Sequence, residues 1–401
     1  LFIGSFFMKS MLIGIVGRPN CGKSTFFKAA TLMDVLIANY PFATIKPNHA
    51  IAYVKIHDLA TDFGKVSNPR EGYVKSEYRF VPFELMDVAG LVEGASEGKG
   101  LGNEFLNDLS TADAFIHVVD MSGEYDSEGK PTKDFYPGKD IQIIERELDL
   151  WYLGILKKVW HGFARTVEMQ KQKFEQAVAK QFSGLKVTED DVRYVVLKSR
   201  LNPEHPTKWS DEDLIKFAQL LRKYTKPMII AANKVDAPNG PANYDKIKNE
   251  FDYEMVPCFA DGELSLRQAD KAGMINYIPG NKTFEIKKDL NEKQKQALDK
   301  IKEVMEKYGN TGIQEVLNRV VFDVLKYVAI YPAGAKLSDS KGNVLPDCYL
   351  MPPGSTALDF AFRLHTDIGK NFVKAIDVKT KQAVGKDYLI KSGDGLEIMT
   401  K

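Results

Sequence analysis

Short apolar runs, separated by amphipathic segments, organise the first two thirds of the chain. Apolar and β-branched residues dominate six of these runs, at residues 11–16, 50–56, 80–86, 114–119, 228–232 and 255–259. Segments with helical spacing lie between most of them. Strands that alternate with helices predict an α/β fold, with a mostly parallel sheet covered on both faces.

The alternation is interrupted between about residues 125 and 226. Residues 122–139 are polar and rich in turn formers, which predicts a loop. From Asp140 to Phe182 apolar residues recur every three or four positions, which predicts one long helix. Thr188 and Ser210 each precede a run of acidic residues, and both predict a helix start. We therefore expect a helical hairpin or small bundle inserted into the α/β domain.

The C-terminal part of the chain changes pattern twice. Residues 281–326 predict two helices, at 291–308 and 313–325. The remaining residues predict a strand, a hairpin turn, a short helix and two more strands, at 327–332, 339–343, 355–365, 372–377 and 396–399. One helix on a small mixed sheet is typical of a ubiquitin-like β-grasp domain.

These patterns predict four parts of the chain. Residues 8–124 and 227–280 form the α/β domain, 125–226 the inserted helical domain, 281–326 a helical connector, and 327–401 the β-grasp domain.

Charge and cysteine content narrow the class of protein. The net charge is +1, but residues 151–226 hold 15 Lys/Arg against 9 Asp/Glu, a local +6. This excess fits either a polyanionic partner or a lysine-rich solvated face. The 3 cysteines are far apart and form no C-x-x-C pair, which favours a reducing cytoplasm. Residues 1–7 are apolar but too few to span a bilayer, so we expect no membrane contact, and nothing demands an oligomer.

The segment after the first apolar run fits the phosphate-binding pattern G-x-x-x-x-G-K-[ST]. Its glycines let backbone N–H groups converge on a phosphate at a helix N-terminus. Lys23 is expected to reach the β- and γ-phosphates, and the hydroxyl of Ser24 to ligate Mg²⁺. The expected phosphate-binding residues are Asn20, Cys21, Gly22, Lys23, Ser24 and Thr25.

Two further segments lie where a nucleotide hydrolase needs them. Asp87 begins a D-x-x-G motif after a predicted strand, and its carboxylate is expected to hold Mg²⁺ through water. The N–H of Gly90 would bond the γ-phosphate. Thr44, in the loop before the second strand, would ligate Mg²⁺ and sense the γ-phosphate. The expected catalytic residues are therefore Lys23, Thr44 and Gly90, and the metal ligands are Ser24, Thr44 and Asp87.

The segment Asn233-Lys234-Val235-Asp236 predicts a guanine site. A carboxylate at Asp236 accepts two hydrogen bonds from guanine, whereas adenine offers no such donor pair. Asn233 would tie this loop to the phosphate loop, and Lys234 would cover the base. The N–H of Ala260, after the last strand of the sheet, would contact the guanine carbonyl. The predicted nucleotide is GTP or GDP.

Taken together, these motifs resemble Obg-family GTPases of the YchF (Obg-like ATPase) branch. The resemblance rests on residues 17–24, on 39–48, on the glycine-rich stretch 87–106, on the helical insert and on a TGS-like C-terminal segment. It covers nearly the whole chain, and it implies a GTP-binding domain, a coiled helical insert and a β-grasp domain associated with ribosomes and RNA. Many members of the branch carry a degenerate base motif and prefer ATP, but this chain keeps N-K-x-D.

Leu91 occupies the position where Ras-type enzymes place a glutamine that orients water. Leucine cannot do so, which predicts slow hydrolysis, with another group or K⁺ beside Asn20 supplying the function. Asn20 is alternatively a residue that only stabilises the loop.

Three hypotheses remain at this point. The first is a GTPase that acts as a switch on the ribosome or rRNA, through the insert and the TGS domain. The second is a nucleotide-dependent scaffold with negligible hydrolysis, and the third is an ATPase of the same fold.

Overall fold

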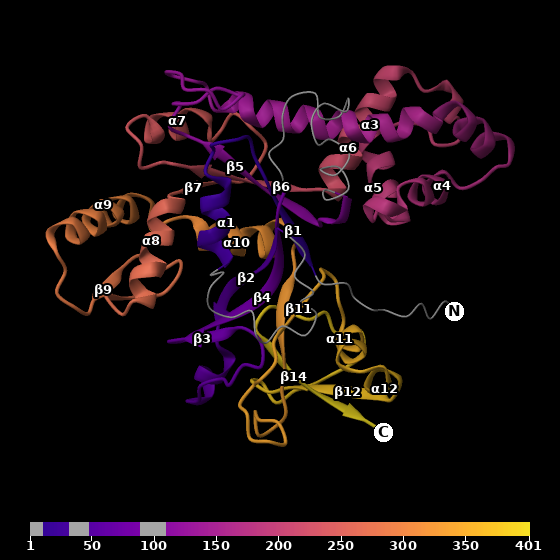
Figure 1. Cartoon of the computed structure of the whole chain (residues 1–401). Helices are drawn as coiled ribbons and strands as arrows, with labels where there is room; N and C mark the ends of the chain where they lie inside the picture. The colour runs from indigo at the N-terminus through magenta and orange to yellow at the C-terminus, as the bar shows by residue number, and fades with distance from the viewer. Residues whose placement is uncertain (1–10, 32–47, 89–109) are drawn as a thin grey trace. The chain divides into compact units, whose positions relative to one another are not determined.

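The computed structural model describes residues 11–31, 48–88 and 110–401 (Figure 1). The chain forms two compact units. The P-loop unit comprises Leu12–Phe27 and the described part of Met86–Gly262; the C-terminal unit comprises the described parts of residues 1–11, 28–85 and 263–401. Each unit is described by itself.

Four parallel strands form the sheet of the P-loop unit. They are β1 (Leu12–Val16), β5 (Ala114–Asp120), β6 (Met228–Asn233) and β7 (Met255–Cys258), hydrogen-bonded in that order. Every residue of β1, β5 and β6 is buried. The helices that follow these strands include α1 (Lys23–Thr31), α7 (Gly240–Ile247) and α8 (Ala260–Lys271). The prediction of a parallel sheet in an α/β domain is confirmed.

Four helices form the insert, between β5 and β6. They are α3 (Gly138–Met169), α4 (Phe174–Gln181), α5 (Glu189–Ser199) and α6 (Asp211–Thr225), with 3-10 turns at Ser183–Leu185 and Pro206–Lys208. Their apolar faces share one core that includes Tyr152, Trp160, Phe174 and Phe217. Thr188 and Ser210 each complete a capping box, so both predicted helix starts are confirmed.

The prediction of one uninterrupted helix from Asp140 to Phe182 is wrong. The helix ends at Met169, and Lys171 adopts a left-handed φ of 50°. The apolar repeat pauses between Val167 and Phe174, where Met169 is exposed and residues 170–173 are all polar. Without apolar contacts to hold it, the helix stops there and restarts at Phe174.

The C-terminal unit begins with a β-rich segment. Its strands are β2 (His49–His57), β3 (Tyr73–Lys75) and most of β4 (Tyr78–Asp87), with a 3-10 turn at Leu59–Phe63. Two short strands, β8 (Ile275–Tyr277) and β9 (Phe284–Ile286), pair with each other. The predicted connector helices are confirmed as α9 (Glu292–Tyr308) and α10 (Ile313–Arg319), and α10 continues into a π-helical turn at Val320–Val324.

The last residues form a β-grasp domain, as predicted. Its sheet has the order β11-β10-β14-β12-β13. The strands are β10 (Val328–Pro332), β11 (Tyr349–Met351), β12 (Phe372–Asp377), β13 (Ala383–Val384) and β14 (Asp394–Thr400), and the helices are α11 (Ala357–Leu364) and α12 (Thr366–Lys370). A buried cluster joins this domain to the segment after β2, through Leu59 and Ala60 on one side and Tyr331 and Leu345 on the other.

Within the described residues, no helix is both long enough and apolar enough to cross a bilayer.

Candidate functional site

The carboxyl ends of the parallel strands bring the predicted motifs of the P-loop unit together. The phosphate loop follows β1, Asp120 ends β5, and Asn233 ends β6. In the register of the sheet Asp120 lies directly opposite Asn233. Ligands of open α/β sheets bind at this edge, so the site lies where the fold favours it.

Two glycines of the phosphate loop occupy places that no other residue would fit. Gly17 has a φ of 158°, and a Cβ there would lie 2.7 Å from the carbonyl oxygen of Val118. Gly22 has a φ of 91°, and a Cβ there would collide with the side-chain amide of Asn233. The loop then enters α1 at Lys23, which puts Lys23, Ser24 and Thr25 in the first helical turn. Backbone N–H groups at such a terminus favour an anion.

Lys23 and Asp87, the residues expected to bind phosphate and Mg²⁺, form an ion pair beside the phosphate loop. The Nζ atom of Lys23 donates to Oδ1 of Asp87 at 2.7 Å. The backbone N–H of Val88 donates to Ile15 at 3.1 Å, which holds Asp87 beside the strand that leads into the phosphate loop. Ser24 is exposed at the same helix start. Hydroxyl and carboxylate oxygens are the protein ligands that Mg²⁺ prefers, so these side chains fit that ion.

Asn233 links three loops of the site. Its Nδ2 donates to the carbonyl of Cys21 at 3.0 Å, and its Oδ1 accepts from the N–H of Ala260 at 3.1 Å. The predicted tie between the N-K-x-D loop and the phosphate loop is therefore confirmed. The N–H of Ala260 was expected to face a guanine carbonyl; here it donates to Asn233, and its contact with a base stays a prediction.

Lys234 is fixed in place by the phosphate loop and by Asp120. Its Nζ donates to the carbonyl of Asn20 at 2.9 Å and to the carboxylate of the fully buried Asp120 at 2.7 Å. The ammonium group also lies 5.0 Å from the ring centroid of Tyr125. Asp236 follows two residues later on the same turn and is half-buried. This arrangement agrees with a lysine stem that covers a base beside a carboxylate that reads it.

Arg18 and Asp140 are part of the site but were not predicted. Arg18, only 4% exposed, donates to the carbonyls of Asp126 and Tyr125 at 2.8 and 3.0 Å. Its Nε pairs with Oδ2 of Asp140, in the first turn of α3. Burial raises the pKa of Asp140 to about 6, although the neighbouring Arg18 guanidinium acts in the opposite direction. The phosphate loop is thereby bonded to the start of the insert.

The loop between β5 and α3 was predicted only as a loop, yet it contacts the phosphate loop a second time. Nδ2 of Asn20 donates to the carbonyl of Gly129 at 3.1 Å. Asn20 has a φ of 64°, and this bond fixes its side chain. Asp120, which ends β5 just before this loop, could have indicated the contact from the sequence. It is a carboxylate at the end of a buried strand, and Asp87 and Asn233 hold similar positions.

Cys21 and Gly22 lie in the loop between β1 and α1. Cys21 is fully buried, and burial raises the pKa of its thiol to about 11, so it is an inert packing group and not a nucleophile. Thr44, Gly90 and Leu91 lie outside the described residues.

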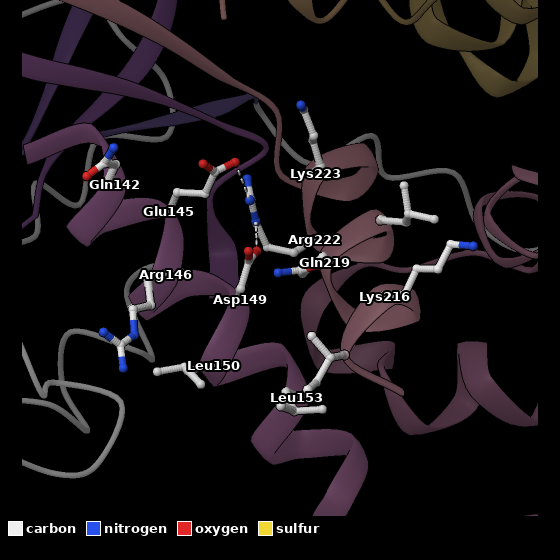
Figure 2. Close-up of a pocket in the computed structure, with 12 residues that line it drawn as sticks. Gln142, Glu145, Arg146, Asp149, Leu150, Leu153, Lys216, Gln219, Arg222 and Lys223 are labelled. Atoms are coloured by element: carbon white, nitrogen blue, oxygen red, sulfur yellow. Dashed lines mark hydrogen bonds and ion pairs between the residues drawn. The ribbon is translucent and has the colours of Figure 1, made fainter. Parts of the chain in front are cut away.

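A groove of about 570 Å³ lies away from this site, between α3 and α6 (Figure 2). Figure 2 shows Arg222 of α6 between Glu145 and Asp149 of α3. Arg222 is 1% exposed, and its pair with Asp149 is 2.7 Å long. None of the predicted nucleotide residues lines this groove.

The fold and the site define a P-loop GTPase joined to a TGS domain. Family profiles agree with this class along the chain. Residues 12–148 match the profile described as 50S ribosome-binding GTPase, 231–334 match Obg-like GTPase YGR210-like, G4 motif-containing domain, and 330–400 match the TGS domain.

The chain belongs to the Obg-like family of YGR210-like and YchF GTPases. It is 45% identical to an uncharacterised GTP-binding protein of Methanocaldococcus jannaschii, over 97% of this chain and 99% of the relative. It is 28% identical to the ribosome-binding ATPase YchF of Escherichia coli O157:H7, over 96% and 98%. A crystal structure of a GTP-binding protein from Pyrococcus horikoshii OT3 is 40% identical, with coverage of 98% and 100% and a TM-score of 0.78.

Proposed function

We propose that this protein binds GTP with Mg²⁺ at the edge of its parallel sheet and hydrolyses it slowly. The observation that supports guanine most is the fixed N-K-x-D loop. Asn233 bonds the phosphate loop at 3.0 Å, and Lys234 bonds the buried Asp120 at 2.7 Å. Asp236, on the same turn, is the carboxylate that we assign to the N1–H and 2-amino group of guanine. Ala260 remains our candidate for the guanine carbonyl.

The choice between GTP and ATP is the first test, because similar proteins carry the names GTP-binding protein and ribosome-binding ATPase. Isothermal titration of the full chain with each nucleotide and Mg²⁺ is expected to give GTP the lower Kd, by about 100-fold or more. Asp236→Ala should weaken GTP binding much more than it weakens ATP binding, so that the preference for GTP is lost. Equal or tighter binding of ATP by the native chain would support the ATPase reading instead.

Hydrolysis is assigned to the phosphate side of the site. Lys23 would contact the β- and γ-phosphates, and Ser24, Asp87 and Thr44 would hold Mg²⁺, which would neutralise phosphate charge when bound. Gly90 would bond the γ-phosphate. Leu91 cannot orient water, so we expect turnover well below 1 per second, as in unassisted GTPases of about 10⁻⁴ to 10⁻² per second.

Phosphate release under multiple turnover tests this assignment, with Lys23→Ala as the inactive control. Release that needs Mg²⁺ and is lost in Lys23→Ala supports a GTPase. Tight GTP binding with no release above the Lys23→Ala background would support the nucleotide-dependent scaffold.

A K⁺ ion beside Asn20 is a narrower proposal about the same reaction. The bond from Asn20 to Gly129 favours its alternative role of holding the loop, although it engages only the amide nitrogen. If K⁺ takes part, hydrolysis should be several-fold faster in KCl than in NaCl. Equal rates would leave Asn20 with the loop role alone.

We further propose that the GTP-bound protein associates with the ribosome or its rRNA through the insert and the TGS domain. Three observations support this: the local +6 of the insert, the TGS match, and relatives named ribosome-binding ATPase. Co-sedimentation with purified ribosomal subunits, with GTP, GDP or no nucleotide, tests it. Binding that depends on neither nucleotide nor salt would contradict a switch.

The remaining proposals concern the cellular location, the oligomeric state and the domain boundaries. We propose a cytoplasmic monomer, divided as predicted into an α/β domain (8–124 and 227–280), the insert (125–226), a connector (281–326) and the TGS domain (327–401). The free cysteines agree with a reducing compartment. Light scattering of the purified chain would test the monomer.

A further inference from the structure

The basic excess of the insert is concentrated in its first half. Residues 151–188 contain 7 Lys/Arg against 2 Asp/Glu, a net charge of +5. Residues 189–226 contain 8 against 7, a net charge of +1. The second half of the insert, with α5 and α6, is therefore nearly balanced. Any attraction of a polyanion must come mainly from the distal half of α3 and from α4.

One face of α3 presents this charge to solvent. Its exposed members follow one another at intervals of four, three, four and four residues, and are Gly154, Lys158, His161, Arg165 and Met169. The opposite face of the same stretch is buried in the core of the insert, through Tyr152, Leu156, Trp160, Ala164 and Val167. We call the exposed residues, with Lys171 and Lys173 just beyond the end of the helix, the basic face.

The cations of the basic face are not used within the fold. In the described part of the chain, Lys158, Arg165, Lys171 and Lys173 form no ion pair, whereas Lys157 at its border pairs with Asp211 at 3.0 Å. The carboxylate beside the face is Glu168, which is already engaged. It accepts a hydrogen bond from Oγ1 of Thr207 at 2.5 Å and lies 3.1 Å from Nδ1 of His205.

Two glycines leave the helix backbone open on this side. A Cβ added at Gly154 or at Gly162 would have no heavy atom within 4 Å, so nothing in the fold requires glycine at either position. Glycine inside a helix destabilises that helix relative to alanine. A partner that packs closely against the helix would explain the two glycines. Without side chains there, the helix surface between the basic residues is flat and the backbone of a partner can come near.

The partner's chemistry follows from what the face lacks. Its exposed large apolar residue is Met169, at 83%, and the phenylalanine, tyrosine and tryptophan rings of this stretch lie in or against the core, which leaves the imidazole of His161 as its exposed ring. Stacking of successive unpaired bases needs several exposed rings, so single-stranded RNA fits poorly. Lys158 and Arg165 are about 10 Å apart along the helix axis, which lets them contact different phosphates of one backbone. Double-helical RNA is recognised largely through such contacts.

We propose that the basic face of α3 binds the phosphate backbone of double-helical RNA. This inference rests on the proposed ribosome association and assigns it to one surface of the insert.

The test compares two double variants of equal charge change in the full-length protein. Lys158→Gln with Arg165→Gln alters the basic face. Arg193→Gln with Lys198→Gln alters the exposed side of α5 and is the matched control. The probes are a 20-base-pair RNA duplex and purified ribosomal subunits, measured from 50 to 300 mM KCl. GTP affinity, measured in parallel, should be the same in all three proteins and verifies folding.

We expect the basic-face variant to bind the duplex about 10- to 100-fold more weakly at low salt. The slope of log K against log salt should fall by about 1.5 to 2, since each lost phosphate contact removes close to one counterion. The control should change less than about twofold. Equal losses in the two variants, or no loss in the first, would overturn the proposal. So would a polyglutamate peptide that competes as well as the duplex, because an acidic protein would then be the partner.

The two proposals fail separately. A native chain that binds the duplex through the basic face but does not bind ribosomal subunits would retain this inference and remove the ribosome association. A native chain whose binding to subunits is unaffected by Lys158→Gln with Arg165→Gln would retain the association and remove the basic face from it.

Discussion

At the residue scale, His117 is a polar side chain buried in the apolar core. It lies in the middle of β5, between Val16 of β1 and Ile230 of β6, and is fully buried. Neither ring nitrogen has a hydrogen-bond partner among the described residues. Burial, with a smaller effect from Arg18, lowers the pKa of His117 to about 3. The ring therefore stays neutral in the native state down to about pH 3.

His117 should make the protein sensitive to acid. An unfolded histidine titrates near pH 6.5, whereas the native ring does not accept a proton until about pH 3. The stabilisation that comes from keeping this ring neutral is thus fully present above pH 6.5. It is lost progressively as the pH falls from 6.5 towards 3. The loss is about 2 kcal/mol at pH 5. His117→Leu should remove this dependence, and it should raise stability because no unpaired nitrogens remain buried.

Urea unfolding of the native chain and of His117→Leu, from pH 7.5 to pH 5, checks this prediction. The gap between the two free energies of unfolding should widen in favour of the variant as the pH falls. A constant gap would mean that a proton or an ordered water reaches the native ring.

At the element scale, the start of α3 is where the insert meets the nucleotide site. Asp140, in the first turn of that helix, pairs with Arg18 of the phosphate loop. One oxygen of Asp140 has no partner in the described structure, and only 3% of the residue is exposed. The helix and the phosphate loop are therefore joined by a charge that burial disfavours. Protonation of this carboxyl weakens the link.

Asp140→Asn is predicted to change the pH dependence in the direction opposite to His117. The native pKa of about 6 lies above the ordinary 3.8, so the native state holds its proton longer than the unfolded state does. The proton on Asp140 therefore stabilises the native state below about pH 4. This stabilisation, about 3 kcal/mol, is lost as the pH rises to 6. The asparagine side chain has no such proton to lose, so the variant should gain stability relative to the native chain over that window.

The free energies of unfolding of the native chain and of Asp140→Asn at pH 4.5, 5.5 and 6.5 give the measurement. A native chain that instead gains on the variant as the pH rises would show that the Arg18 charge dominates the burial of Asp140. GTP affinity measured on the same samples reports whether the link matters for the phosphate loop.

The elements that the sequence pattern predicted are those with a local cause. The runs that became β1, β5, β6 and β7 are apolar except for His117, and the capping boxes of Thr188 and Ser210 can be recognised directly from the residues. The short strands β3, β8, β9, β11 and β13 were missed, because their pairing depends on neighbours and not on their own composition. The end of α3 at Met169 was missed because Lys171 gives no signal of a left-handed turn.

The candidate site divides in the same way. Lys23, Asp87 and Asn233 were predicted because their spacing within motifs carries the chemistry, and the structure brings them to one edge. Arg18 and Asp140 are 122 positions apart, and no motif connects them. Their contact exists only because the loop after β5 folds back onto the phosphate loop, a tertiary arrangement that a single sequence does not reveal.

At the scale of the whole molecule, the C-terminal unit joins the TGS domain to the β-rich segment that precedes Asp87. The hydroxyl of Tyr331 donates to the carbonyl of His57 at 3.0 Å. Arg79 of β4, 1% exposed, donates to the carbonyls of Leu345 and Pro346 at 3.1 and 2.9 Å. The TGS domain is thus attached to residues 49–85, the stretch between the two segments predicted to respond to the γ-phosphate.

Arg79 should be the anchor of this attachment, and Arg70 only an accessory. Arg79→Ala leaves two carbonyls without their donor and opens a cavity, whereas Arg70, 56% exposed, loses only surface pairs with Asp339 and Asp347. We expect Arg79→Ala to lower the free energy of unfolding by about 2–3 kcal/mol, and Arg70→Ala to lower it by less than about 1 kcal/mol.

Hydrogen exchange of the native chain and both variants locates the effect. Amides of residues 333–348 should exchange faster in Arg79→Ala, including that of Leu345, which donates to Leu337. Amides of β5 and β6 should keep their protection. If Arg70→Ala loosened the same loop as much as Arg79→Ala, the surface ion pairs, and not the buried arginine, would be what holds the TGS domain.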